Sequence, residues 1–211
     1  MFKHLPNAPL ADKRPTKATV HSVTLHDDFA WLRADNWQEA MRDPTKLPED
    51  IADYLRAENA YYDAAMADTA DLQAKLIAEM RGRIKEDDTS VPRKNGAYAY
   101  VMRYSEGAEH PVYIRTPRDG GDEVVLLDVN AEAAAHEYFD LGAVAVSPDH
   151  GGLAWKADTT GSEFFTLRLR DTATGQDSAT LIADVGSVAW ADGRTLFYVR
   201  VDAQHRPNKV F

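Results

Sequence analysis

The sequence contains no cysteine among its 211 residues. Disulfides, thiolate metal sites and cysteine nucleophiles are therefore excluded. No stretch approaches the roughly 20 consecutive apolar residues of a membrane span. The first residues also lack the apolar core of a secretory signal peptide. We therefore expect a cytoplasmic protein that has no membrane partner.

Positive charge is in the minority. The chain has 24 Lys and Arg residues against 34 Asp and Glu residues, which gives a formal net charge of −10. Nucleic-acid-binding surfaces need an excess of basic residues, so we expect no nucleic-acid partner. The acidic balance instead favours cationic partners or substrates.

Motifs that carry chemistry are also missing. No serine follows a glycine by two positions, so the sequence has no G-x-S-x-G nucleophile elbow. His136-Glu137 lacks the second histidine of a zinc motif. Gly120-Gly121 and Gly151-Gly152 are typical of hairpin turns and do not form a phosphate loop. We expect no catalytic residue, no metal and no cofactor in this chain.

The first third of the chain has mainly helical patterns. Residues 19–25 alternate loosely and predict one short strand, and Asn36 with Glu39 resembles a capping box that opens a short helix. Pro48 followed by two acids predicts the start of a longer helix. Asp68 is placed to cap a further helix, so the pair predicts a helical hairpin or one bent helix. The apolar stripe of these helices comprises Ile51, Leu55, Tyr62, Leu72, Leu76, Ile77 and Met80, and we expect it to be uncovered when the chain stands alone.

The hydrophobic period changes from helical to alternating between Arg81 and Arg118. Pro92 prevents any helix from continuing, and from Tyr98 onward the pattern indicates strands separated by turns. One face of the first strand should carry Tyr98, Tyr100, Met102 and Tyr104. Later half-buried strands are indicated by the alternating apolar residues Phe165, Leu167 and Leu169, and by Phe197, Val199 and Val201.

An internal repeat occurs in the strand-rich part. The segment VAVSPDHGGLAWKAD (144–158) matches VAWADGRTLFYVRVD (188–202), with Asp149 aligned to Asp192 and Trp155 aligned to Tyr198. NGAYAYVMR (95–103) also matches DGRTLFYVR (192–200). Repeats of about 40–50 residues that contain several strands are typical of propeller blades. An antiparallel sandwich with chance similarity remains the alternative.

Six segments in order resemble the N-terminal third of prolyl oligopeptidase-family serine peptidases, and most of all oligopeptidase B. They are DDFAWLR (27–33), YLRAENAYYDAAM (54–66), EMRGRIKEDDTSVP (79–92), YAYVMRYSEGAEHPVYIR (98–115), SPDHGGLAWKADTTGSEFFTLRLRD (147–171) and TLFYVRVDAQHRPNKVF (195–211). The similarity covers nearly the whole chain from about residue 13.

The resemblance implies a mixed fold with two parts. Residues 1–82 would be an N-terminal extended and helical segment that packs on an α/β-hydrolase domain. Residues 83–211 would be the first blades of a β-propeller, two to three of an expected seven. The Ser-Asp-His triad of the family would lie in the hydrolase domain, outside this chain, which should therefore be inactive alone.

The resemblance also implies a function. Oligopeptidase B-like members cleave short peptides after Arg or Lys, and their propeller gates access to the active site. Glu163 lies in a turn between two expected strands, where its carboxylate could meet a cationic peptide side chain or could simply be solvated. His205-Arg206-Pro207 could contact a ligand or form an ordered turn. A non-catalytic propeller that binds peptides or proteins is the alternative function.

Overall fold

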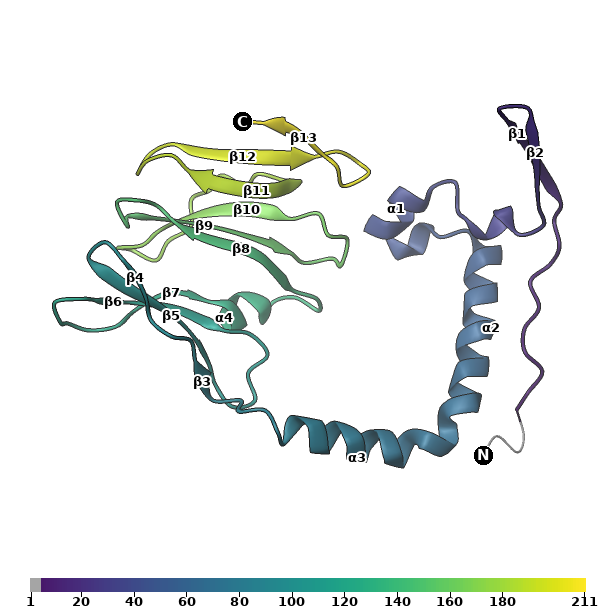
Figure 1. Cartoon of the computed structure of the whole chain (residues 1–211), viewed down its shortest axis with the longest axis horizontal. Coiled ribbons are helices and arrows are strands. Elements are labelled where there is room, and N and C mark those ends of the chain that lie inside the picture. The colour runs from purple at the N-terminus through teal and green to yellow at the C-terminus, as the bar shows by residue number, and fades with distance from the viewer. Residues whose placement is uncertain (1–4) are drawn as a thin grey trace. The chain divides into compact units, whose positions relative to one another are not determined.

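A computed structural model describes residues 5–211 (Figure 1). The chain divides into two compact units, of which the first ends at Ile84 and the second comprises Lys85–Phe211. The division follows the last helix of the first unit, where the charged segment Lys85–Asp88 begins.

The first unit begins with a two-stranded hairpin. Strand β1 (Thr16–Val20) pairs antiparallel with β2 (Val23–Asp27), and His21 and Ser22 turn the chain with positive φ angles. The prediction of a single strand over residues 19–25 was therefore wrong. The alternation within each short strand is real, but two non-glycine residues adopt left-handed φ angles that a pattern of apolar residues does not reveal.

The helical segments of the first unit all follow this hairpin. They are η1 (Ala30–Leu32), α1 (Trp37–Arg42), η2 (Pro44–Lys46), α2 (Glu49–Met66), η3 (Ala67–Thr69) and α3 (Ala70–Arg81). Helix α2 continues through η3 into α3, and the two long helices do not lie side by side (Figure 1). Of the two predicted forms, the structure has the bent path and not the helical hairpin.

Neither predicted side-chain cap forms. Asn36 precedes α1, but its side-chain amide donates to the carbonyl oxygen of Lys46 at 2.8 Å and makes no cap hydrogen bond. Asp68 lies inside η3, and Thr69 occupies the N-cap position of α3 without a cap hydrogen bond. Because the backbone is already helical through η3, α3 has no free N-terminus for Asp68 to cap.

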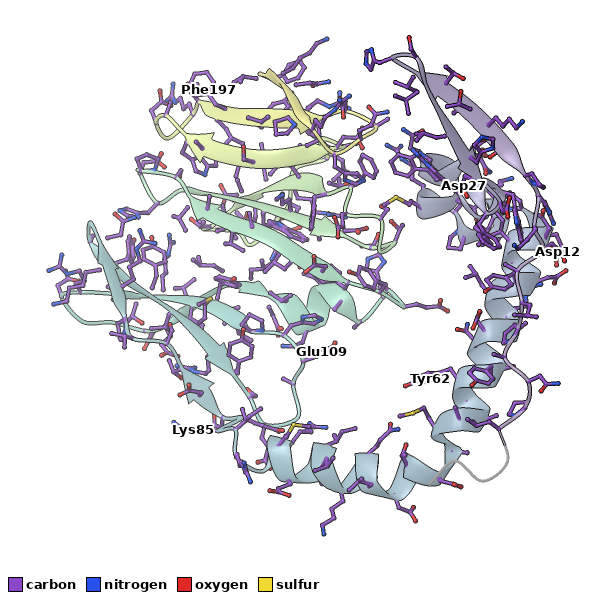
Figure 2. All side chains as sticks on the ribbon, turned by 45° about the vertical axis from the view of Figure 1, so that its right-hand side comes forward. Asp12, Asp27, Tyr62, Lys85, Glu109 and Phe197 are labelled. Atoms are coloured by element: carbon purple, nitrogen blue, oxygen red, sulfur yellow. The ribbon has the colours of Figure 1, made fainter. Side chains whose placement is uncertain are left out.

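The apolar stripe of α2 and α3 is largely exposed, as predicted. Ile51, which is 5% exposed, is the exception. The exposed members are Leu55, Tyr62, Leu72, Leu76, Ile77 and Met80, and Tyr62 is labelled in Figure 2. The partly buried Trp31 is held by contacts within this unit, because its indole donates to the carbonyl of Asp12 at 2.8 Å and lies under the guanidinium of Arg14.

The second unit consists of antiparallel sheets stacked face to face (Figure 1). In the first sheet β5 pairs with β6, β6 with β7, and both β3 and β4 pair with β5; the later sheets have the orders β8-β9-β10 and β11-β12-β13. The elements are β3 (Asp88–Thr89), β4 (Arg93–Asn95), β5 (Tyr98–Tyr104), β6 (Val112–Pro117), β7 (Val124–Asp128), α4 (Val129–Ala133), β8 (Asp140–Val146), β9 (Gly152–Asp158), β10 (Thr166–Asp171), β11 (Val185–Trp190), β12 (Leu196–Val201) and β13 (Pro207–Val210). Within residues 5–211 these sheets do not close into a ring.

The internal repeat corresponds to two equivalent hairpins. Segment 144–158 forms the end of β8 with β9, and segment 188–202 forms the end of β11 with β12. In the first turn the carboxylate of Asp149 accepts from the N–H of Gly151, and in the second the carboxylate of Asp192 accepts from the N–H groups of Arg194 and Thr195. The aligned aspartates therefore have the same role, which is to accept hydrogen bonds from backbone N–H groups of the turn.

Two hydrophobic cores separate the three sheets. Leu127, Leu153 and Trp155 belong to the core between the first and second sheets, and Ala154, Leu167 and Val185 form the centre of the next one. Consecutive residues of β9 therefore point into different cores, and the whole strand after Gly152 is buried. A two-sheet sandwich has no sheet covered on both faces, so the sandwich alternative does not describe this unit.

The last sheet differs from its prediction. Leu196 and Tyr198 of β12 pack on the inner core, so Phe197, Val199 and Val201 lie on the opposite face. Phe197, labelled in Figure 2, is 51% exposed. Both faces of β12 are apolar, and alternation alone could not decide which face is covered.

Candidate functional site

The loop that joins β9 to β10 carries Glu163, and a buried carboxylate holds this loop in place. Asp158, at the end of β9, is 2% exposed. One of its oxygens accepts from the backbone N–H and the hydroxyl of Thr160 at 2.8 and 2.9 Å, and the other accepts from the N–H of Glu163 at 2.6 Å. Because a buried carboxylate is costly unless its lone pairs are used, these bonds determine the shape of the loop.

Glu163 is held by its backbone and not by its side chain. Its φ angle is 60°, in the left-handed region that non-glycine residues rarely adopt, and the residue is exposed. Such a conformation persists where the surrounding structure determines it, here through the N–H bond to Asp158. The carboxylate is therefore presented at a defined place on the surface with its oxygens available.

Negative charge gathers around this loop. The ring of Tyr138 lies close to Gly161. The pKa of Tyr138 is raised by partial desolvation and then by three neighbouring carboxylates, those of Asp140, Asp158 and Glu163. An arrangement of this kind can attract a cation, and it offers neither an activated nucleophile nor a base positioned beside one.

The loop between β12 and β13 is built in the same way and lies next to the first. The carboxylate of Asp202 accepts from the N–H groups of Gln204 and Arg206, and the guanidinium of Arg206 donates to it. The ring of His205 lies 4.0 Å from that of Phe164, centroid to centroid. The segment His205-Arg206-Pro207 is thus an ordered turn, and the structure brings it beside the residue that follows Glu163.

A polar cluster at the opposite ends of the strands was not predicted. His150 lies in the β8–β9 turn with a φ angle of 64°, and its Nδ1 is 2.7 Å from the hydroxyl of Tyr100. The guanidinium of the buried Arg115 donates to the carbonyl of His150 at 2.6 Å and lies over the ring of Tyr98. The sequence did place Tyr98 and Tyr100 on one face, but no spacing links them to a histidine 50 residues later.

Residues that could hold a metal ion do not come together in the described part of the chain. No group of three or more His, Asp or Glu side chains is arranged for metal binding within residues 5–211. No helix among these residues is long and apolar enough to cross a membrane.

Nearly the whole chain is similar to known proteins. A sequence profile described as "Prolyl oligopeptidase, N-terminal beta-propeller domain" matches residues 9–210. Dipeptidyl aminopeptidase BI of Pseudoxanthomonas mexicana is 36% identical over 92% of this chain and 28% of its own length. Protease 2 of Moraxella lacunata is 27% identical over 96% of this chain and 29% of its own length.

A solved structure shows the same fold. The structure of oligopeptidase B from Leishmania major superposes with a TM-score of 0.84 and 29% sequence identity, over 97% of this chain and 30% of that protein. The chain thus spans less than a third of the length of these relatives. It belongs to the prolyl oligopeptidase family of peptidases, of which it represents the N-terminal β-propeller region.

Proposed function

We propose that this chain is the N-terminal part of a cytoplasmic serine endopeptidase that cleaves short peptides after Arg or Lys. An α/β-hydrolase domain outside residues 1–211 would supply the Ser-Asp-His triad, and the propeller would gate access to it. The observation that carries the proposal is the family match over residues 9–210 in a chain that covers under a third of its relatives.

The division of labour between the two units is part of the proposal. Residues 1–82 would pack on the hydrolase domain through the exposed stripe of α2 and α3, since a large exposed apolar patch marks an interface. Residues 83–211 would be the first blades of a seven-bladed ring. Three sheets in an unclosed stack leave outer faces such as that of Phe197 for further sheets to cover.

The preference for Arg or Lys is supported by charge. The chain has a net charge of −10, and the carboxylates of Asp140, Asp158 and Glu163 lie near one another around Tyr138. Glu163, the exposed member, would contact a cationic side chain of the peptide. A group of carboxylates guides an incoming cation by long-range attraction, even where each charge adds little to the binding affinity.

The experiment compares purified 1–211 with the longer polypeptide that includes the hydrolase domain. A fluorogenic peptide that ends in Arg should be cleaved by the longer polypeptide and not by 1–211, and a serine-directed covalent inhibitor should abolish the cleavage. Turnover by purified 1–211 that the inhibitor abolishes would contradict the proposal. If the longer polypeptide contains only further propeller blades and no hydrolase domain, the alternative hypothesis of a non-catalytic, peptide-binding propeller is supported instead.

One observation favours a second specificity. The relative that is 36% identical is named a dipeptidyl aminopeptidase, a name for enzymes that act at the amino end of a peptide. Matched fluorogenic peptides with a free and with an acetylated amino terminus distinguish the two. Endopeptidase activity cleaves both, whereas dipeptidyl aminopeptidase activity requires the free terminus.

A further inference from the structure

The second unit contains a pocket of about 720 Å³ between its first and second sheets. Its walls are mainly apolar and include Tyr100, Met102, Val144, Val146, Leu153 and Trp190. Ser90, Arg93 and Asn95 contribute polar groups to the lining. This volume and this mixture of many apolar and few polar groups are typical of small-ligand sites.

The pocket results from an interruption in the strands that pair with β5. Strands β3 and β4 are separated by residues 90–92, where Pro92 has no N–H to donate. At the start of this interruption the side-chain hydroxyl of Ser90 accepts from the N–H of Met102 at 2.9 Å. The facing strand, β8, contributes Val144, Ala145 and Val146 to this space, and these small side chains leave the gap unfilled.

Two hydrogen bonds hold aromatic walls of the pocket. The hydroxyl of Tyr100 pairs with Nδ1 of His150 at 2.7 Å, and the indole N–H of Trp190 donates to the carbonyl of Ala145 at 3.0 Å. Both rings are therefore positioned before a ligand arrives. A preformed site loses less conformational entropy on binding.

Arg93 supplies the charge of the pocket. It is paired with Tyr100 across the β4–β5 ladder, so both side chains lie on the pocket face. Arg93 is exposed, and no carboxylate of residues 5–211 pairs with it. By contrast, Arg103 pairs with Glu123, and Arg170 pairs with Glu132 and Asp177. Beside apolar walls, a free guanidinium is suited to a carboxylate.

We infer that this pocket binds the C-terminal residue of a peptide, with the apolar side chain between the sheets and the α-carboxylate on the guanidinium of Arg93. The amide of Asn95, which lies on the same face as Arg93, can donate to the second carboxylate oxygen. The inference rests on the proposed function, in which the propeller handles peptides. A site of this kind selects peptides by the distance between the C-terminus and the scissile bond.

The chain offers a matched control. Lys94 carries the same charge as Arg93 and is adjacent to it, but it pairs with Ala99 and so lies on the other face of the sheet. Substituting either residue by Gln removes one positive charge from the same strand. Only Arg93→Gln removes it from the pocket.

The test measures fluorescence anisotropy of a peptide with fluorescein at its N-terminus and Ala-Ala-Leu at its C-terminus, titrated with the whole chain 1–211. The free acid should bind about tenfold more tightly than the C-terminal amide, as expected for a lost hydrogen bond to a charged group. Arg93→Gln should reduce the affinity for the acid to that for the amide, and Lys94→Gln should leave it unchanged. Met102→Trp, which fills the pocket from a partly exposed position, should abolish binding of both peptides.

Three results would overturn the inference: equal affinity for acid and amide, equal effects of Arg93→Gln and Lys94→Gln, or full binding by Met102→Trp with an unchanged circular dichroism spectrum. Octanoate, the carboxylate of a free fatty acid, serves as competitor. If it binds more tightly than the peptide acid, the pocket is a fatty-acid site and the peptide assignment is wrong. Anisotropy requires no hydrolysis, so failure of the peptidase proposal and failure of this one are observed separately.

Discussion

The two units use apolar residues in opposite ways. In the second unit, apolar side chains from neighbouring sheets meet in two cores, and β9 is buried on both faces. In the first unit, the apolar stripe of α2 and α3 is exposed apart from Ile51. Similar residue types thus contribute to internal stability in one unit and remain available to a partner in the other.

The largest effect should come from the core of the second unit. Trp155→Ala removes a fully buried indole from between the first and second sheets. We expect the free energy of unfolding of this unit to fall by about 3–5 kcal/mol, the cost of a large-to-small core substitution. Leu76→Ala in the exposed stripe should change the free energy of unfolding of the first unit by less than about 0.5 kcal/mol. Urea unfolding followed by circular dichroism measures both changes. Similar losses of stability for the two variants would contradict the contrast between a buried core and an exposed stripe.

The next prediction concerns the stripe as an interface. Leu76→Glu should leave 1–211 unaffected but weaken attachment to the hydrolase domain in the longer polypeptide by about 1.5–3 kcal/mol, the value of burying one leucine. The control is Ala78→Glu, which by helical geometry lies on the opposite face of α3. Thermal unfolding of the longer polypeptide with each substitution provides the measurement. Equal shifts for the two variants would mean that the stripe is not the interface.

A smaller effect distinguishes two carboxylates of one loop. Glu163→Gln should raise KM for Arg or Lys substrates of the longer polypeptide by about two- to fivefold, the range for an exposed ion pair. Stability should not change, because the buried Asp158 bonds the backbone N–H of Glu163 and not its side chain. Asp119→Asn, an exposed charge in the turn after β6, is the control. Unchanged steady-state kinetics for Glu163→Gln would show that Glu163 does not contact the cationic side chain of the substrate.

The smallest effect is a pH dependence at the boundary between the second and third sheets. Lys156 is buried, and its amino group donates to the carbonyls of Val185 and Gly186. Burial lowers the pKa of Lys156, and Asp140 raises it to a lesser extent. Between the lowered folded pKa and the unfolded value of about 10.4, the unfolded chain binds more protons. The free energy of unfolding should therefore rise with pH in this alkaline range.

Lys156→Met provides the check on that pH dependence. Urea unfolding between about pH 8 and pH 10 should show a smaller rise for the variant than for the original chain, since only the latter carries the depressed lysine. Parallel pH profiles would show that Lys156 titrates alike in the folded and unfolded states.

Much of this protein was determined by local sequence. The long helices follow from apolar residues at helical spacing with a proline and acids at the start, and the change to strands follows from Pro92 and the alternation after Tyr98. The equivalent hairpins follow from the repeat, because Asp149 and Asp192 satisfy turn donors within a few residues. Each of these features depends on interactions between near neighbours in the chain.

Only the tertiary structure decided which surfaces meet. Both faces of β12 are apolar, and the position of the second sheet selects Leu196 and Tyr198 over Phe197 as its contacts. The contact of His150 with Tyr100 joins residues 50 positions apart, and Asn36 bonds the carbonyl of Lys46 where a local motif predicted a cap. The pocket beside Arg93 likewise requires two sheets to stack. Periodicity specifies which residues share a face, but the partner of that face depends on packing between segments distant in the sequence.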